Sequence, residues 1–312
     1  PQNSKAPIAK AAEPPLPQYP LSFTQNQAPL ATSAFAVCSG QDKRLPNSDP
    51  RPSAGCRGWK QRKGIHFECR QPLPVTCEMT RSVARDTFYS NMVRTSAKCD
   101  GLSEIGDEGK DGVWRVCLSA PYELKRNSCL VYSFGINYEW SFDDALSKVH
   151  RCDVRAFDPS MNQEDHQRDD RISFYNLGIK GHGMKFEDAQ KNKWKMMTIK
   201  EIAEMLGHSN RIIDILKVDI EYAEWDSFED LVTSGLLKNI KQLVTEFHAW
   251  ADHTYAYVRF YRILVALENA GFEKWFINNK TMMKYNSKEP QTGKKKTYYF
   301  QTDVSYINTN FL

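Results

Sequence analysis

The chain has 312 residues, with 42 basic and 38 acidic side chains and a formal net charge of +4. No basic field dominates, so nucleic acid is not an expected partner. No run reaches the roughly 18 apolar residues of a membrane span, and no signal peptide is visible. The sequence starts at Pro1 without a methionine. We therefore expect any link to a membrane to depend on a missing N-terminal anchor.

Composition divides the chain into three parts. Residues 1–55 are rich in Pro, Ser, Gln and Ala and have little apolar periodicity, which predicts a flexible stem or linker. Residues 56–112 contain several cysteines and predict an irregular N-terminal extension, with one helix over 80–97. In residues 113–312 short apolar runs alternate with helical patterns, as expected for one regular domain.

The cysteines indicate the compartment. All eight lie in the first half of the chain, at Cys38, Cys56, Cys69, Cys77, Cys99, Cys117, Cys129 and Cys152. None has the C-x-x-C spacing of a zinc site. An even number favours disulfides and an oxidising compartment, with buried free thiols in a cytosolic protein as the alternative. The glycosylation sequon Asn279-Lys280-Thr281 points the same way. We expect the secretory pathway, either the Golgi lumen or secretion.

The regular domain predicts an α/β fold. Short apolar runs predict strands over 130–134, 154–157, 172–175, 212–218, 240–245, 272–277 and 298–304. Helical patterns over 141–149, 198–206, 224–231 and 255–270 separate most of them. Alternating strands and helices favour a mostly parallel sheet that is covered on both faces. No helix separates the last two strands, which we expect to form an antiparallel pair.

The first three predicted strands end in candidate ligand-binding residues. Gly135 is the one glycine after the first strand, where a dinucleotide fingerprint has three, so pyrophosphate binding is disfavoured. Asp158 ends the second strand and could accept both hydroxyls of a ribose, or cap the turn before Pro159. Asn176 and Gly178 follow the third strand. They could lie beside the base or the methionine part of a cofactor, or simply form a tight connection that needs glycine.

The fourth and fifth strands end in ionisable side chains. Asp219 and Glu221 are two residues apart, so they share one side of an extended chain, and so do Glu246 and His248. A histidine at this edge suits a general base because its usual pKa lies near neutrality. Asp219, Glu246 and His248 could instead hold Mg or Mn. Solvated acids at the end of a strand are the structural alternative.

These segments together resemble the class I S-adenosylmethionine-dependent methyltransferases. More narrowly, residues 85–312 resemble the group of methyltransferase-like protein 24, which is related to FkbM-type O-methyltransferases. The matching segments are Trp114–Cys117, Cys129–Gly135, Ser141–Asp143, Phe157–Ser160, Asn176–Gly178, Leu216–Trp225 and Glu246–Trp250. The resemblance implies a Rossmann-like fold, with a mostly parallel seven-stranded sheet whose last strand is antiparallel.

The resemblance also implies S-adenosylmethionine as the cofactor. Gly135 and its neighbours would face the methionine part and Asp158 the ribose, and the full set of expected cofactor-binding residues is Ser133, Phe134, Gly135, Asp158, Asn176, Gly178 and Asp219. In this fold Cys129 and Cys152 precede neighbouring strands, so a bridge between them is expected. Two features depart from the family pattern: the first loop lacks the usual glycine repeat, and Tyr222 stands where FkbM-type sequences often have glycine.

We expect an O-methyltransferase that acts on a sugar hydroxyl of a glycoprotein or oligosaccharide. His248, Asp219 and Glu221 are the expected catalytic residues. Aromatic side chains offer faces for stacking on a sugar, or else belong to the core; they are Trp225, Trp250, Tyr222 and Tyr255. Two alternatives remain: a non-catalytic glycan- or protein-binding module with the same fold, and an O-methyltransferase for a small molecule.

Overall fold

The computed structural model describes the backbone of residues 65–67 and residues 79–107, 112–181, 191–249, 251, 254–288 and 294–312. The expected stem, four of the cysteines and Trp250 lie outside these ranges. Within them, no helix combines the length and apolar character needed to cross a bilayer. The domain boundaries expected at 55/56 and 112/113 stay predictions.

The described residues form short strands and mostly short helices. The helices are α1 Arg81–Met92, α2 Ser141–Lys148, α4 Ile199–Met205, α5 Glu224–Thr233 and α6 Thr254–Asn269, with 3-10 turns η1 Pro159–Met161, η2 Leu237–Asn239 and η3 Thr309–Phe311. The strands are β1 Ile65–Phe67, β2 Ala97–Cys99, β3 Leu102–Ile105, β4 Trp114–Cys117, β5 Leu130–Phe134, β6 Asp153–Phe157, β7 His166–Gln167, β8 Ile172–Tyr175, β9 Gly178–Ile179, β10 Met196–Met197, β11 Ile213–Val218, β12 Ile240–His248, β13 Phe272–Asn279, β14 Lys284–Lys288, β15 Lys295–Tyr299 and β16 Gln301–Asn308.

One mixed sheet organises these elements, in the order β13-β16-β12-β11-β5-β6-β8-β7. β8, β6, β5, β11 and β12 are parallel, and β16 lies antiparallel between β12 and β13. The two-residue strand β7 adds an antiparallel edge that the sequence did not predict. The predicted α/β fold, with a mostly parallel sheet and an antiparallel last strand, is confirmed.

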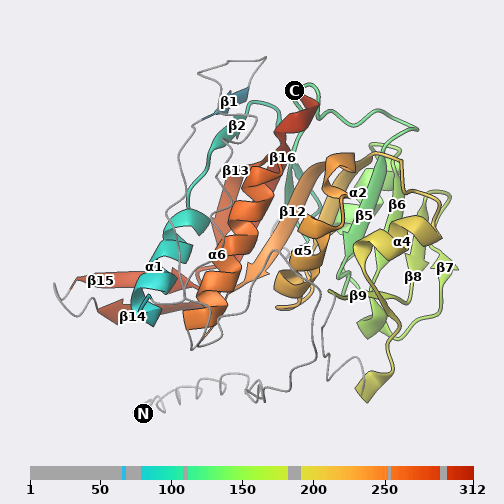
Figure 1. Ribbon diagram of the computed structural model, residues 1–312. Helices are drawn as coiled ribbons and strands as arrows, with labels where there is room; N and C mark the ends of the chain where they lie inside the picture. The colour runs from blue at the N-terminus through green and yellow to red at the C-terminus, as the bar shows by residue number, and fades with distance from the viewer. Residues whose placement is uncertain are drawn as a thin grey trace, which may run out of the picture. The chain divides into compact units, whose positions relative to one another are not determined.

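Helices cover both faces of this sheet. On one face α1, α6, α5 and α4 lie side by side in that order (Figure 1). On the other face α2 and the β3–β4 hairpin pack on a core that includes Val131 of β5 and Val244 of β12. Every residue of β11 is buried, including its two charged residues, Asp214 and Lys217.

Two expected elements differ in the structure. The run 298–304 was predicted as one strand, but it is divided at Phe300 between the β14–β15 hairpin and β16. The Phe300 amide donates to the carbonyl of Met283, and its own carbonyl accepts from Ala249, so the chain changes partners there. The helix predicted over 80–97 ends at Met92, because residues 97–99 pair with β1 instead. The extension predicted as irregular thus contains β1, α1, β2 and β3.

Contacts with distant parts of the chain hold α1 in place. Arg85 donates to the hydroxyls of Tyr285 and Tyr298, at 3.0 and 3.1 Å. Asp86 accepts from Lys296 at 2.6 Å. Phe88 is fully buried against the aromatic side chains of α5 and α6. Helix α1 is therefore attached to elements that lie near the carboxyl end of the chain.

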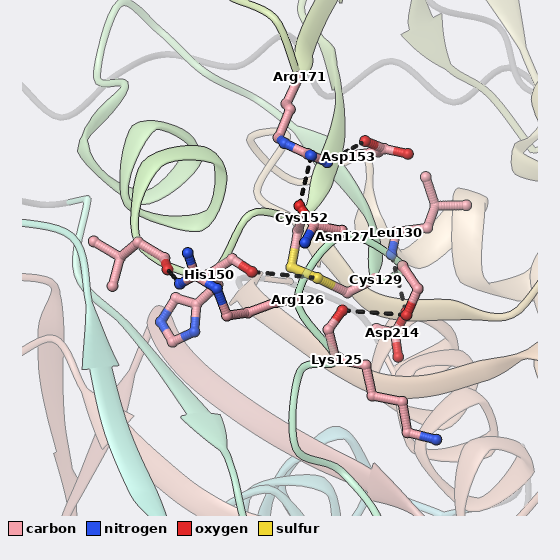
Figure 2. The surroundings of a disulfide bond; sticks show 12 residues. Lys125, Arg126, Asn127, Cys129, Leu130, His150, Cys152, Asp153, Arg171 and Asp214 are labelled. Atoms are coloured by element: carbon pink, nitrogen blue, oxygen red, sulfur yellow. Dashed lines mark hydrogen bonds and ion pairs between the residues drawn. A yellow bond between two sulfur atoms is a disulfide. The ribbon is translucent and has the colours of Figure 1, made fainter.

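The starts of β5, β6 and β11 form what we call the amino edge of the sheet. Cys129 and Cys152 form a disulfide there, with their Cα atoms 4.7 Å apart, which confirms the expected bridge (Figure 2). Arg171 donates to Asp153 at 3.1 Å and to Asn127 at 2.7 Å. A second disulfide joins Cys99 to Cys117.

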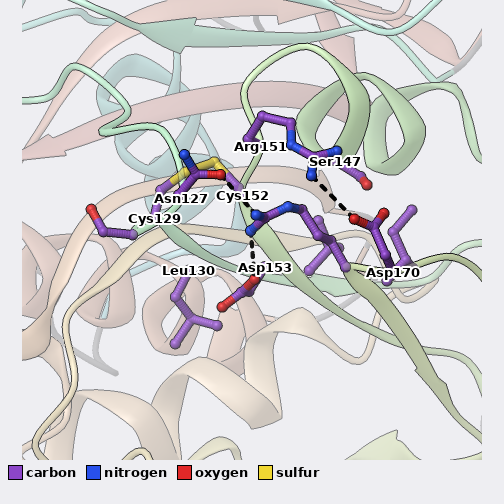
Figure 3. Close-up of polar contacts among 12 residues, drawn as sticks. Asn127, Cys129, Leu130, Ser147, Arg151, Cys152, Asp153 and Asp170 are labelled. Atoms are coloured by element: carbon purple, nitrogen blue, oxygen red, sulfur yellow. Dashed lines mark hydrogen bonds and ion pairs between the residues drawn. A yellow bond between two sulfur atoms is a disulfide. The ribbon is translucent and has the colours of Figure 1, made fainter.

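Further acidic side chains at the amino edge also have donors. Arg151 pairs with Asp170 at 3.1 Å (Figure 3). Asp214, near the start of β11, accepts from the amide of Leu130 at 2.9 Å and from Lys241 at 2.8 Å. The second oxygen of Asp153 accepts from Arg211 at 3.3 Å. Acid and base are thus matched in pairs along this edge.

Candidate active site

A cavity of about 400 Å³ opens at the carboxyl edge of the sheet, where β5, β6 and β11 end. This volume lies in the range of small-molecule sites. The cavity is lined mainly by the β5–α2 loop and α2 (Gly135, Asn137, Glu139, Asp143), by the end of β6 (Asp158, Pro159, Ser160), by β9–β10 and Trp194 (Gly178, Ile179, Met196), and by β11 and the loop after it (Lys217, Asp219, Glu221).

Gly135 brings two loops of the cavity into direct contact. Its φ is +78°, and a Cβ at this position would lie 1.6 Å from the carbonyl oxygen of Asp219. The Asp219 amide also donates to the carbonyl of Phe134 at 3.2 Å. Only glycine fits both the positive φ and the close approach. The single glycine of the first loop therefore has a specific structural reason.

Asp158 holds the loops beside the cavity. Its Oδ2 accepts from the amides of Ile136 and Asn137 at 2.9 and 2.8 Å, and its Oδ1 accepts from the amide and hydroxyl of Ser160 at 2.8 and 2.6 Å. The expected cap before Pro159 is present. A carboxylate has about four acceptor sites, so a ribose hydroxyl would have to replace one of these donors. The ribose role of Asp158 stays a prediction.

Some of the other expected cofactor-binding residues line the cavity, and others lie outside its wall. Phe134 and Gly178 line the cavity, and a Cβ on Gly178 would lie 2.5 Å from the sulfur of Met196. Asn176 is not among the lining residues, and its amide donates to Asp165. Ser133 is fully buried behind the wall. The structure thus favours Gly178 over Asn176 as a contact for a ligand.

The predicted grouping of Glu246, His248 and Glu221 is present in space. His248 Nε2 lies 3.3 Å from Glu221 Oε2 and 3.4 Å from Glu246 Oε1. Glu221 reaches this position through a turn with a φ of +54°, not through an extended chain. Glu224, at the start of α5, was not predicted; its Oε1 lies 3.2 Å from His248 Nδ1.

The charge state of His248 differs from the expectation. Burial disfavours the imidazolium, but the hydrogen bond to Glu224 and the charges of Glu224, Glu221 and Asp219 together raise the pKa of His248 to about 9. The ring is therefore protonated at neutral pH, a state in which it cannot accept a proton. His248 is also not among the residues that line the cavity.

Asp219 is better placed to accept a proton. It lines the cavity, and no hydrogen bond reaches its carboxylate from the described residues. Burial raises the pKa of Asp219 to about 6, with Glu224 and Glu221 adding to the rise and Lys217 and His248 opposing it. At neutral pH the carboxylate is mostly ionised, yet it is more basic than an ordinary aspartate.

Carboxylates outnumber cations in this cluster. Burial and the charges of Asp219 and Asp303 raise the pKa of Glu246 to about 8, although Lys280 and His248 oppose the rise. Lys280 lies 3.4 Å from Glu246 and 3.3 Å from Asp303.

The structure also changes the set of residues that could hold a metal. One ligand atom each from Asp219, Glu224 and His248 lie within 4.8 Å of one another. Glu224 thus takes the place that was predicted for Glu246. Binding of a metal there stays a prediction.

Three charged residues of the cavity were missed from the sequence, namely Glu139, Asp143 and Lys217. Lys217 Nζ donates to the carbonyls of Phe134, at 3.1 Å, and Gly135, and it lies 5.2 Å from the centre of the Trp114 ring. Asp143, in the first turn of α2, is 1% exposed. A lone lysine within the buried run Ile215-Leu-Lys-Val218 was the available signal.

Only some of the aromatic side chains that were expected to stack on a sugar have exposed rings. Trp225 is buried, stacked between Phe247 and Phe260 at 4.6 and 4.2 Å, and it donates to the carbonyl of His248. It therefore belongs to the core. Tyr222 and Tyr255 are 42% and 38% exposed. Tyr222 has a φ of +80°, a conformation that favours glycine.

Comparison with known proteins shows which family this chain resembles. The family model described as "Methyltransferase domain" matches residues 58–301. The human protein named "Probable methyltransferase-like protein 24" is 26% identical over 98% of this chain and 88% of its own length. The rat protein of the same name is 26% identical over 84% of this chain and 76% of its own length. Among solved structures, M. capricolum TrmK with S-adenosyl-homocysteine overlaps 60% of this chain and 66% of its own, at 9% identity and a TM-score of 0.26, a likeness too low to bear on function.

Proposed function

The chain belongs to this methyltransferase-domain family, and on that premise we propose that it transfers a methyl group from S-adenosylmethionine to a hydroxyl oxygen of a sugar. The observation that carries the proposal is the cavity at the carboxyl edge, with the carboxylate of Asp219 in its wall and no hydrogen bond to that carboxylate from the described residues. In open α/β sheets, ligands bind at this edge.

The residues of the cavity fit the methyl donor that the family implies. Gly135 lets the first loop pack directly against the loop that carries Asp219, because a Cβ would collide with the Asp219 carbonyl. Gly178, Met196 and Ser160 form a mixed apolar and polar wall on the other side. When bound, S-adenosylmethionine supplies an electrophilic methyl group. The protein's own part is to hold the acceptor oxygen in line with that group and to exclude water.

Asp219 takes the proton of the acceptor hydroxyl in this proposal. Its carboxylate faces the cavity, is ionised at neutral pH and has no hydrogen bond from the described residues to compete for its lone pairs. A positioned general base of this kind contributes about 10²- to 10⁴-fold in rate. Glu221 and the protonated ring of His248 set the charge of the cluster and do not move the proton.

Several observations support a sugar acceptor in the secretory pathway. The resemblance to FkbM-type O-methyltransferases favours an oxygen acceptor. Tyr222 and Tyr255 have exposed ring surface for a sugar, and Tyr222 follows the cavity residue Glu221 directly. The two disulfides in the described chain are typical of an oxidising compartment such as the Golgi lumen or the extracellular space. Glycoproteins and oligosaccharides are abundant polyhydroxyl substrates there.

A divalent cation is an additional proposal. Mg or Mn at Asp219, Glu224 and His248 would lower the pKa of an acceptor hydroxyl, and would require His248 to lose its proton. Removing metal with a chelator and adding each ion back separates this route from direct proton transfer to Asp219. Unchanged turnover after chelation would rule the cation out.

The test begins with calorimetric titration of S-adenosylmethionine and S-adenosylhomocysteine, with and without Mg or Mn. We expect micromolar binding, about −8 kcal/mol. Methyl transfer to a panel of sugars, small phenols and peptides then identifies the acceptor class. Turnover on phenols alone would favour a small-molecule O-methyltransferase. The absence of donor binding under every condition would contradict the proposal and favour a non-catalytic binding module.

A further inference from the structure

The cavity contains a second buried carboxylate that the proposed proton transfer does not use. Asp143 lines the wall formed by α2 and is 1% exposed. Its Oδ1 has no hydrogen-bond partner among the described residues. The hydroxyl of Ser133 lies beside it but forms no hydrogen bond of normal geometry either. A buried carboxylate oxygen without a donor is costly, so a ligand that supplies one would be bound there.

Lys217 does not fill this role. Its ammonium donates to the carbonyls of Phe134 and Gly135 and faces the ring of Trp114. In the described structure no ion pair joins it to Asp143. Lys217 favours the ionised form of Asp143 through its charge, against the burial that raises the pKa of Asp143 to about 6. The carboxylate is thus mostly ionised at neutral pH, in the wall of the cavity, while its Oδ1 accepts no hydrogen bond from the described residues.

We propose that Asp143 binds the ammonium group at the amino-acid end of the methyl donor. The inference rests on the proposed function, because it takes S-adenosylmethionine as the ligand. Asp143 lies on the side of the cavity formed by the β5–α2 loop, which is where the methionine part is expected. An ammonium offers N–H donors to the unpartnered oxygen, whereas the sulfonium of the donor has none. Asp143 therefore recognises a group that the donor and its product share.

Three ligands and two variants test this assignment. The ligands are S-adenosylmethionine, S-adenosylhomocysteine and 5′-methylthioadenosine, which lacks the amino-acid end. The variant Asp143→Asn keeps the size of the side chain and removes its charge. The matched control is Asp144→Asn, the adjacent residue of α2, which pairs with Lys148 and Arg168 outside the cavity, each at 3.0 Å. Calorimetry gives each affinity, and thermal unfolding checks that each variant is folded.

We expect Asp143→Asn to bind both S-adenosyl ligands at least tenfold more weakly, which is about 1.4 kcal/mol. Its affinity for 5′-methylthioadenosine should stay within about twofold, and Asp144→Asn should leave all three affinities unchanged. A loss confined to S-adenosylmethionine would assign Asp143 to the sulfonium and overturn the inference. An equal loss for all three ligands would give Asp143 a structural role only, and no loss would exclude it from binding.

A measurement on the unaltered protein decides the matter if Asp143→Asn does not fold. The analogue of S-adenosylhomocysteine that carries a hydroxyl in place of the ammonium should bind at least tenfold more weakly than the parent compound. Equal affinities would overturn the inference while leaving the proposed function intact. If the unaltered protein binds neither S-adenosyl ligand nor 5′-methylthioadenosine, the proposed donor itself is wrong, and the inference fails with it.

Discussion

The two edges of the central sheet use the same kinds of side chain in opposite ways. At the amino edge each of Asp153, Asp170 and Asp214 meets a basic partner at 2.8 to 3.3 Å. At the carboxyl edge Asp219, Glu221, Glu224 and Glu246 surround the single imidazole of His248. A carboxylate that is paired with a basic side chain is not available to bind a ligand or accept a proton. Unmatched buried carboxylates shift pKa values and mark a site where stability has been given up for function.

The largest expected effect is on catalysis, at the carboxyl edge. Asp219→Asn removes the proposed base and should lower the rate of methyl transfer about 10²- to 10⁴-fold, with the affinity for S-adenosylhomocysteine nearly unchanged. The matched change at the amino edge, Asp153→Asn, should leave the rate unaltered. Rates are measured with the best acceptor of the panel. If both variants keep full activity, Asp219 is not the base.

Alanine substitutions at two glycines compare the packing of the cavity loops with the packing at the end of a helix. Gly135→Ala should lower the free energy of unfolding by at least about 3 kcal/mol, because its Cβ overlaps the Asp219 carbonyl at a φ of +78°. Gly207, at the end of α4, has a φ of +72° but no atom within 4 Å of a Cβ, so Gly207→Ala should cost only about 1 kcal/mol. Denaturant unfolding measures both, and equal losses would mean that the loop contact adds nothing.

Removing the disulfide tests the amino edge as a purely structural region. Replacing Cys129 and Cys152 together by alanine opens a loop with a sequence separation of 23 and should cost about 3 kcal/mol. The affinity of the folded variant for S-adenosylhomocysteine should not change, because the bridge lies at the edge opposite the cavity. A large loss of affinity at temperatures where the variant is folded would show that the two edges are coupled.

The pH dependence of stability should come from the carboxyl edge. His248 has a pKa of about 6.5 when unfolded and about 9 when folded, so the stability that its protonation contributes is present below pH 6.5 and lost as the pH rises through 9. Glu246, with its folded pKa raised to about 8, acts in the same direction. His248 alone should lower the free energy of unfolding by on the order of 2 kcal/mol between pH 7 and 9.

Two histidine variants locate this effect. His248→Gln should reduce the fall in unfolding free energy between pH 7 and 9. His150, close to the disulfide, has its pKa lowered by burial and by Arg126, so it is neutral across this window. His150→Gln should therefore leave the fall unchanged. A fall of the same size in His248→Gln would assign the pH dependence to other groups.

Regular parts of the fold could be predicted because local sequence patterns determine them. The strands 130–134 and 172–175 were located to the residue, and the helices of the regular domain to within one or two residues. The break at Phe300 could not be predicted, because it arises from contacts with Met283 and Ala249, and the run of residues around it is uniformly compatible with a strand. Tertiary contacts determine where such a strand is divided, and these contacts cannot be inferred from a single sequence.

The residues of the cavity that could be predicted are those at or just after the end of a strand. Asp219, Gly135, Asp158 and Glu221 all have that position, and all line the cavity. Asp143 was not assigned a role, because an acid in the first turn of a helix is ordinarily explained by the helix dipole. The protonated state of His248 could not be predicted either, since it depends on Glu224, which lies 24 residues away in the sequence.

The attachment of α1 has a consequence for how the chain is made. Arg85 and its partner Tyr285 are separated by 200 residues, and α1 also packs on α6. At roughly 5–20 residues per second, a ribosome needs on the order of 10–40 s to synthesise the intervening segment. During that time the apolar face of α1, with Ala84, Phe88 and Met92, has no native surface to cover it. The nascent protein should thus depend on chaperones until α6 and the β14–β15 hairpin have been synthesised.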